Sequence, residues 1–320
     1  SPQYEGTQDG TAGVGKAANG IVYSRHNLSS YGEHYQATLS VVGTSTATGI
    51  DPQNVATTEI CVFCHTPHFG NQGMGPLWNR GSAATGYVAY GTTIAGTSIT
   101  TVGGASLACL SCHDGVTQLD MLINKPGKGS RTNGTGAPVG WVFGEVGEYI
   151  GDTNGSSPDA NNVLLTDKAA SRLNIGGDNA GSRNAAAVDL SNDHPINVTY
   201  NGGTAASLRA TSTVISSLTM DNARSTANDS TMDIYGRSDN LWAVKGFISS
   251  SATIADVLRD NGKVQCSSCH DPHYKNQTNT DPAVVAASGG FITSVENDGL
   301  FLRRVGGNSN SGVCRTCHGK

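Results

Sequence analysis

The sequence predicts a mostly irregular chain with few short helices and small β-hairpins, wrapped thinly around a core that its own side chains do not supply. Of the 320 residues, 37% are hydrophobic and only 6% are aromatic, while 42 are glycine. Such a composition offers little apolar surface to offset the conformational entropy lost on folding. The second observation is a pentapeptide, Cys-x-x-Cys-His, which occurs four times.

The four pentapeptides contain every cysteine of the chain. The cysteines are Cys61, Cys64, Cys109, Cys112, Cys266, Cys269, Cys314 and Cys317, and the histidines that follow are His65, His113, His270 and His318. With 9 histidines in 320 residues, histidine would follow all four Cys-x-x-Cys units by chance roughly once in a million. In c-type haem attachment two thiols bond to the porphyrin and the adjacent imidazole becomes the proximal iron ligand. Zinc sites or disulfides would leave the four histidines unexplained. The pattern therefore predicts four haems c.

These haems would supply the core that the composition lacks. Each is a rigid apolar plate bonded to the chain at two thiols and at one or two imidazoles. We therefore expect the fold of a multihaem cytochrome c, in which the polypeptide wraps a stacked haem core.

Charge and hydropathy restrict the partners. The net charge is −5 with 14% charged residues, and haem propionates would make it more negative, which disfavours nucleic-acid binding. No apolar run has the length of a transmembrane segment.

No signal peptide is visible, and the start at Ser1 is typical of a mature product whose leader has been removed. Since haem attachment normally follows export, we expect an extracellular or outer-surface location, with the periplasm as the alternative.

The spacing of the motifs predicts an internal repeat. Each pair of motifs is separated by 48 residues, from Cys61 to Cys109 and from Cys266 to Cys314, and one offset of 205 superimposes the pairs. We therefore expect a single tetrahaem domain over residues 1–320 with four parts. They are an extended arm (1–25), a first dihaem module (26–113), a Gly/Asn/Ser-rich excursion (114–190) and a second dihaem module (191–320).

Only short regular elements are expected between the motifs. Alternating Thr and Ile over 91–104 predict a hairpin, and a strand is expected after Pro195. Short helices are predicted after Thr166, over 253–260 and from Asp281-Pro282, where Asp caps the helix and Pro occupies its first turn. Other helices should be short turns around the haem motifs.

Five histidines remain for four distal iron positions, namely His26, His34, His68, His194 and His273. Bis-histidine ligation of all four haems is therefore the economical interpretation. Relative to His/Met ligation, it favours a low reduction potential.

The local sequence around these histidines refines the assignment. His68 follows His65 by three residues with Pro67 between them, so it points away from the iron of His65 and should ligate a different haem. The same argument applies to His273, and it requires neighbouring porphyrins to lie close together. His194 is favoured because Pro195 restricts the backbone. For the fourth position His26 is preferred, and His34 remains the alternative.

Several segments together resemble a known family. They are Cys-Val-Phe-Cys-His-Thr-Pro-His, Pro-Leu-Trp-Asn-Arg, Cys-Leu-Ser-Cys-His-Asp-Gly, Asp-His-Pro-Ile and Cys-Ser-Ser-Cys-His-Asp-Pro-His. They resemble multihaem c-type cytochromes of the extracellular filament type, and four haems on this length of chain is similar to its tetrahaem outer-surface members. The resemblance covers the haem modules and His26, and says little about residues 114–190.

This resemblance implies a homopolymer. Its haems would stack in alternating parallel and T-shaped pairs along the filament, and one distal histidine would come from the neighbouring subunit. In a related hexahaem filament the shared histidine lies in the first Cys-x-x-Cys-His-x-x-His, which corresponds to His68 here, with His26 or His34 as the rival. Redox partners or extracellular electron acceptors complete the expected set.

The expected function is electron transfer through four bis-histidine haems, as the repeating subunit of an extracellular filament. The alternative is a soluble periplasmic or cell-surface tetrahaem shuttle with all ligands in cis. An enzyme is not expected, because catalysis at haem iron needs an open axial position and the histidines are sufficient to close all four.

Overall fold

The computed structural model of the chain describes all four Cys-x-x-Cys-His motifs. The described residues are 21, 24, 26–30, 35–41, 57–81, 86–94, 97–114, 117, 119, 121–125, 131–132, 138–145, 175, 187–191, 193–203, 207–218, 240–274, 301–308 and 311–319. His34, the helices predicted after Thr166 and from Asp281, and nearly all of the predicted arm lie outside these residues. The predicted excursion is described only in part.

The chain divides into two units. The N-terminal unit is Asn27–Val198, and the C-terminal unit combines Ser1–His26 with Thr199–Lys320. Each unit contains two of the four haem motifs.

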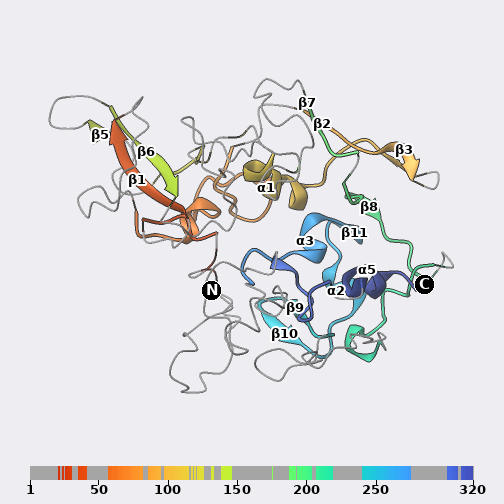
Figure 1. Cartoon of the computed structure of the whole chain (residues 1–320). Coiled ribbons are helices and arrows are strands. Elements are labelled where there is room, and N and C mark those ends of the chain that lie inside the picture. Colours follow the sequence, from red (N-terminus) through yellow and green to blue (C-terminus); the bar gives the residue numbers. More distant parts are fainter. Residues whose placement is uncertain are drawn as a thin grey trace, which may run out of the picture. The chain divides into compact units, whose positions relative to one another are not determined.

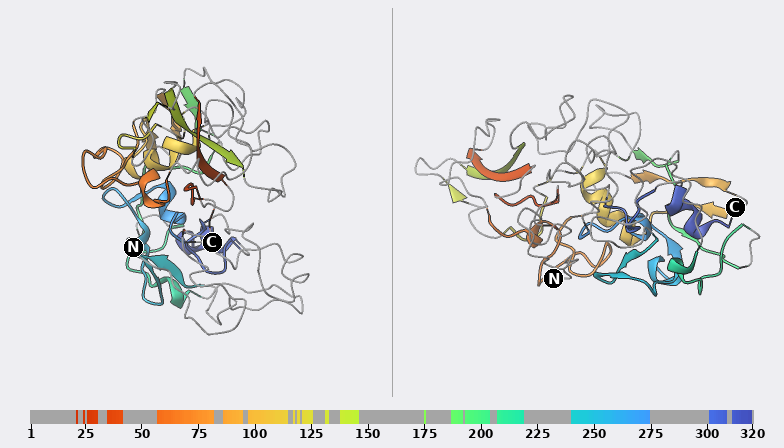
Figure 2. Two further views of the ribbon diagram at one scale, coloured as in Figure 1. Left: turned by 90° about the vertical axis from the view of Figure 1, so that its left-hand side faces the viewer. Right: turned by 60° about the horizontal axis from the view of Figure 1, so that its bottom comes forward.

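The N-terminal unit contains a three-stranded antiparallel sheet, in the order β1-β6-β5 (Figures 1 and 2). β1 is Tyr35–Val41, β6 is Pro138–Glu145 and β5 is Arg131–Thr132. β1 and β6 pair along their whole common length, from Tyr35 opposite Glu145 to Val41 opposite Val139. Valine and aromatic residues in β6 suit a pleated surface. This strand lies within the segment that the sequence predicts to be an excursion.

Smaller elements complete this unit. β3 (Gly91–Ile94) and β4 (Thr97–Ile99) form an antiparallel hairpin, which confirms the prediction for 91–104. β2 (Gly86–Val88) pairs in parallel with β7 (Ala187–Asp189). The helical elements are η3 (Cys61–Phe63) and α1 (Gly104–His113). Leu110 on α1 packs with Val188 and Leu190, so the end of α1 is anchored beside β7.

The C-terminal unit is built from short elements. They are η4 (Ile215–Ser217), β9 (Trp242–Val244), β10 (Phe247–Ser249), α2 (Ile254–Val257), β11 (Lys263–Val264), α3 (Cys266–Cys269) and α5 (Gly312–Cys317). β8 (Val198–Thr199), the expected strand after Pro195, leads into this unit and is ordered beside β11. β9 and β10 form a hairpin whose turn residues, Lys245 and Gly246, have positive φ angles of 50° and 88°. Two consecutive positive φ angles match the twist of a two-residue hairpin.

The predicted helix over 253–260 is real but shorter. α2 ends at Val257, and its start is fixed by a capping box between Thr253 and Asp256. The side chains of Ile254 and Val257 are buried with those of Trp242 and Ile215. The full buried cluster is Tyr200, Ile215, Trp242, Val244, Ala252, Ile254 and Val257. The described part of this unit therefore has a side-chain core of its own.

Candidate haem-binding sites

Each of the four motifs forms a short helical turn. The turns are η3, the end of α1, α3 and α5. The backbone N–H groups of His65, His270 and His318 donate to the carbonyl of the first cysteine of their motif, at 2.8, 3.1 and 3.0 Å. Residues three and four positions apart are neighbours on the surface of a helical turn. The turn therefore brings the two thiols and the following histidine of a motif together.

The thiols are available for covalent attachment. All eight cysteines lie in the described part of the chain, and none forms a disulfide. Cys61 and Cys314 are exposed, whereas the other six are partly buried. The first cysteine of one motif in each unit is therefore open to solvent, while the second lies deeper.

The two motifs of a unit meet at their second cysteines. Cys64 and Cys112 pack against one apolar cluster of Val62, Phe63 and Leu119. Burial raises the pKa of the Cys64 thiol to about 12, and the charge of a Cys112 thiolate is the next cause. Burial also raises the pKa of Cys269 to about 12, followed by the charge of Cys317. In each unit, the charges of the second cysteines of the two motifs therefore interact.

A second segment holds the first motif of each pair, and we call these segments the clamps (77–80 and 301–304). Thr66 N–H donates to Leu77 O and Asn79 N–H donates to Cys64 O, both at 2.8 Å. In the C-terminal unit, Asp271 N–H donates to Phe301 O and Arg303 N–H donates to Cys269 O, also at 2.8 Å. His65 and His270 accordingly form isolated antiparallel bridges with Trp78 and Leu302. The backbone around His65 and the backbone around His270 are therefore held by the same pattern of hydrogen bonds.

The third residue of each clamp also uses its side chain in the same way. Asn79 Nδ2 donates to Val62 O at 2.6 Å, and Arg303 Nε donates to Ser267 O at 2.8 Å. Val62 and Ser267 occupy the same position of their motifs. The net contribution of one such bond is about 1 kcal/mol, but an unpaired buried carbonyl costs more. Asn79 and Arg303 are therefore equivalent despite their different charge.

The last residue of each clamp is a buried arginine that reaches the helix carrying the second motif of its unit. Arg80 donates from Nε to Ser111 O at 2.9 Å and from Nη1 to Leu119 O at 2.8 Å. Arg304 donates from Nη1 to Gly307 O at 2.9 Å, and its guanidinium covers the start of α5 so closely that a Cβ on Gly312 would collide with it. Arg80 thus bonds directly to the second motif of its unit, and Arg304 packs against the first residue of the helix that carries the second motif.

The first residue of each clamp has an unusual backbone conformation. Leu77 and Phe301 have φ angles of 58° and 55°, in the left-handed region that most side chains avoid. Their surroundings differ, because the Leu77 side chain is 52% exposed. The ring of Phe301 instead stacks on the His26 imidazole, with ring centroids 4.1 Å apart and planes 17° apart.

Tyrosines support the second motifs. The single hydroxyl hydrogen of Tyr200 is within hydrogen-bond reach of Arg209 O, at 2.8 Å from Oη, and of Cys317 O, at 3.1 Å. In the N-terminal unit, Tyr87 Oη donates to Asp114 Oδ2, at 3.3 Å, directly after His113. Burial raises the pKa of both phenols. Both therefore remain neutral donors over the physiological pH range.

The predicted distal histidines differ in their environments. His68 and His194 are exposed, and His26 and His273 are partly buried. The backbone carbonyl of His68 accepts from Thr66 Oγ1 and from Asn124 Nδ2, at 3.0 and 2.9 Å. The imidazole of His273 bonds to the carboxylate of Asp271 at 3.1 Å.

Two of the predicted distal histidines belong to a different unit from the pair of motifs beside which the sequence places them. His26, expected beside the first motif pair, belongs to the unit of Cys266 and Cys314. His194, expected beside the second pair, belongs to the unit of Cys61 and Cys109.

Sequence reasoning missed the clamps. The offset of 205 superimposes the cysteines, but the clamps are related by 224 residues, from Leu77 to Phe301. The signal was a shared pattern, an apolar pair followed two residues later by arginine, in Leu77-Trp78-Asn79-Arg80 and Phe301-Leu302-Arg303-Arg304. A search with a variable offset would have found it.

Neither further features of the described residues nor known proteins add to this site. Within the part of the chain that the structure describes, no three His, Cys, Asp or Glu residues gather as a metal-ion cluster, and none of the described helices is long and apolar enough to span a bilayer. A comparison with protein-family models gives no match, and neither does a comparison with curated protein sequences.

Proposed function

We propose that this chain is an electron-transfer protein with four covalently attached haems c. The single observation that carries the proposal is the occurrence of four Cys-x-x-Cys-His motifs that contain all eight cysteines. The proposed thioether residues are those cysteines, and the proximal ligands are His65, His113, His270 and His318.

The chemistry of the donor set supports this proposal. Eight thiols without disulfides, each pair followed by a histidine on the same turn, supply what the attachment of haem c requires. Large apolar side chains also lie open beside the first motif, with Phe69 88% exposed and Leu77 52% exposed. An apolar plate at this position would cover them.

The clamps give the proximal histidines fixed positions. The clamps bond to the backbone of Cys64 and Cys269, next to His65 and His270, and the buried arginine at the end of each clamp reaches the helix that carries the second motif. When bound, each haem iron would take up and release one electron. The polypeptide keeps the attachment points of paired haems close together, which is what rapid transfer between them needs.

His26, His68, His194 and His273 are the proposed distal ligands, with His34 as the alternative. The stacking of His26 on Phe301 makes it a candidate for a haem of the C-terminal unit, and His194 is a candidate in the N-terminal unit. Ligation by histidine at both axial positions would give low potentials.

We further propose that the chain is the repeating subunit of an extracellular filament. This rests on the family resemblance, and the exposure of His68 suits a ligand that reaches a haem of the next subunit. A soluble shuttle with all ligands in cis is the alternative outcome.

A spectroelectrochemical titration tests electron transfer. The protein, matured in a host that attaches haem c, should take up four electrons per chain and show four low-spin ferric haems by electron paramagnetic resonance. A variant with Cys314→Ala and Cys317→Ala should take up three. A stable high-spin haem in the resting protein would contradict complete bis-histidine ligation.

A further inference from the structure

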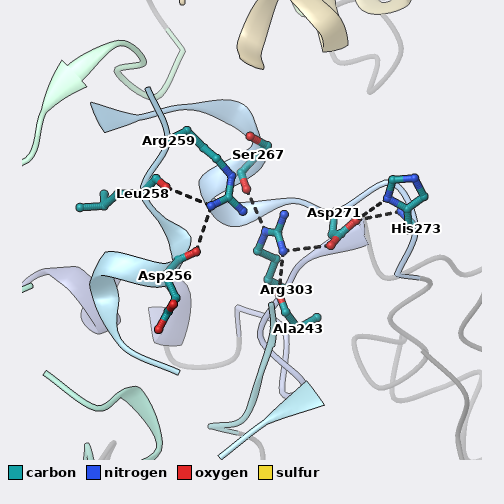
Figure 3. A network of polar contacts seen from close by, with 8 residues as sticks. All are labelled: Ala243, Asp256, Leu258, Arg259, Ser267, Asp271, His273 and Arg303. Carbon is teal, nitrogen blue, oxygen red and sulfur yellow. Dashed lines mark hydrogen bonds and ion pairs between the residues drawn. The ribbon is translucent and has the colours of Figure 1, made fainter. Parts of the chain in front are cut away.

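A buried carboxylate lies between the proposed distal histidine His273 and a buried arginine (Figure 3). Asp271 Oδ1 is 3.1 Å from His273 Nδ1, and Asp271 Oδ2 accepts from Arg303 Nη1 at 2.9 Å. Asp271 and Arg303 are each 5% exposed. The three side chains therefore form a continuous polar chain that is closed to water over most of its length.

The arginine is fixed independently of the histidine. Arg303 also donates to Ala243 O at 2.7 Å and to Ser267 O at 2.8 Å, as Figure 3 shows. Charge-assisted bonds of this kind are among the strongest in proteins. Arg303 thus holds the Asp271 side chain in a fixed position through a charge-assisted hydrogen bond.

The hydrogen bond with Asp271 engages the Nδ1 nitrogen of His273. A carboxylate only accepts hydrogen bonds, so Nδ1 of His273 must carry the hydrogen that it donates to Asp271. The backbone N–H of His273 donates to the same oxygen at 3.0 Å, which holds the ring close to the carboxylate. Nε2 then carries the lone pair, and it lies on the side of the ring away from Nδ1.

At the equivalent positions of the N-terminal unit, the residues are not an acid and an arginine. Thr66 corresponds to Asp271, and its hydroxyl donates to the backbone carbonyl of His68, not to the ring. Asn79 takes the place of Arg303. The two Cys-His-x-Pro-His segments therefore share a backbone frame but differ in what contacts the outer histidine.

We propose that Asp271 is a positioning residue that presents Nε2 of His273 to iron and strengthens it as a ligand. The inference rests on the proposed function. A carboxylate on the far nitrogen of a metal-bound histidine orients the ring and raises its basicity. A more basic ligand favours ferric iron, so the haem held by His273 has a lower potential than it would have without Asp271.

The test compares two variants with the wild-type protein, each carrying haem. Asp271→Asn removes the charge while keeping a similar shape, and the double variant Thr66→Asp with Asn79→Arg imports the pair into the other unit. For each protein, intact mass gives the number of haems, and spectroelectrochemistry gives the four midpoint potentials.

We expect Asp271→Asn to keep four haems and to raise one midpoint potential while three stay in place. The imported pair should lower the potential of one different haem, and this second result decides the matter if Asp271→Asn does not fold. Four unchanged potentials in a folded variant with four haems would overturn this inference alone. A wild-type chain without haem would overturn the proposed function and this inference with it.

Discussion

The two units hold their first haem motif with the same backbone hydrogen bonds and with different side chains. In the N-terminal unit the two side chains at the positions of Thr66 and Asn79 are neutral, and both bond to Asn124. In the C-terminal unit the corresponding residues are charged, with Asp271 paired to Arg303. The backbone frame is therefore the part that the motif requires. The side chains around it differ in charge, so the electrostatic environment differs between the two sites.

Their apolar packing differs as well. Trp242, Ile254 and Val257 belong to a buried cluster of the C-terminal unit, whereas the cluster beside the first motif consists of Val62, Phe63 and Leu119. Burial of large side chains stabilises by about 1.5–3 kcal/mol each. The motifs of the C-terminal unit thus rest on a larger side-chain core among the described residues.

The largest expected difference concerns the two outer histidines. His68→Ala should abolish filaments seen by electron microscopy, because the proposed interchain iron ligand would be lost. His273→Ala, the matched change in the other unit, should leave filaments and convert one haem to the high-spin form. Normal filaments with four six-coordinate haems in His68→Ala would show that the shared ligand lies elsewhere.

The next largest effect tests the assignment of His26 to the C-terminal unit and of His194 to the N-terminal unit. In a background with Ala at Cys266, Cys269, Cys314 and Cys317, only the haems of the N-terminal unit can attach. His194→Ala should then convert one of the two remaining haems to high spin by electron paramagnetic resonance. His26→Ala should leave both unchanged in the same background, because His26 stacks within the C-terminal unit.

A high-spin haem in His26→Ala within that background would contradict this assignment of the two histidines. In the otherwise unmodified chain, His26→Ala should convert one haem, and Phe301→Leu should do so only in part because the ligand is kept but its stacking partner is lost.

The clamp arginines should matter for stability in both units. Arg80→Leu leaves two buried carbonyls unpaired, those of Ser111 and Leu119, and should lower the free energy of unfolding by about 3 kcal/mol. Arg304→Leu should have a similar effect. Urea unfolding of the haem-loaded variants measures both.

Arg259 provides the control for this comparison. It is only partly buried and donates to Asp256 O and Leu258 O at 2.9 and 3.0 Å (Figure 3), so Arg259→Leu should cost about 1 kcal/mol. Equal effects at Arg259 and Arg80 would contradict the role of the clamps.

The smallest effect is the acid sensitivity of α2. The hydrogen bond from Lys245 lowers the pKa of Asp256 to about 2, with further bonds from Thr253. A lowered folded-state pKa stabilises the protein above the ordinary value near 3.8, and this stability is lost as pH falls toward 2. Since the Lys245 side chain is 77% exposed, the contribution should be only about 0.5 kcal/mol.

Urea unfolding at pH 6 and pH 3 measures this contribution in the wild-type protein and in Asp256→Asn. The variant should show a smaller difference between the two pH values. Asp189→Asn in the N-terminal unit is the control, because Asp189 also has a lowered pKa but is fully exposed. A larger change at Asp189 than at Asp256 would contradict the assignment.

Local features could be predicted from the sequence because their causes are local. The turns at the cysteine motifs follow from spacing within five residues, and the hairpin over 91–104 follows from alternating residues on either side of a short connection. The position of the histidine at the end of each motif follows from the same short-range pattern.

Features that join distant segments could not be predicted. β1 pairs with β6 although Leu39 and Trp141 are far apart in sequence, and no periodicity in one strand identifies its partner. The clamps were hidden because the insertions of the two halves fall at different places. The stacking of His26 on Phe301 likewise joins the two ends of the chain.

Intact mass under denaturing conditions tests the central claim most directly. Protein matured with haem c should exceed the 32.9 kDa of the polypeptide by the mass of four haems, and digestion should place one haem on each Cys-x-x-Cys-His peptide. A mass equal to the bare polypeptide, with the eight cysteines free or joined as disulfides, would contradict the account.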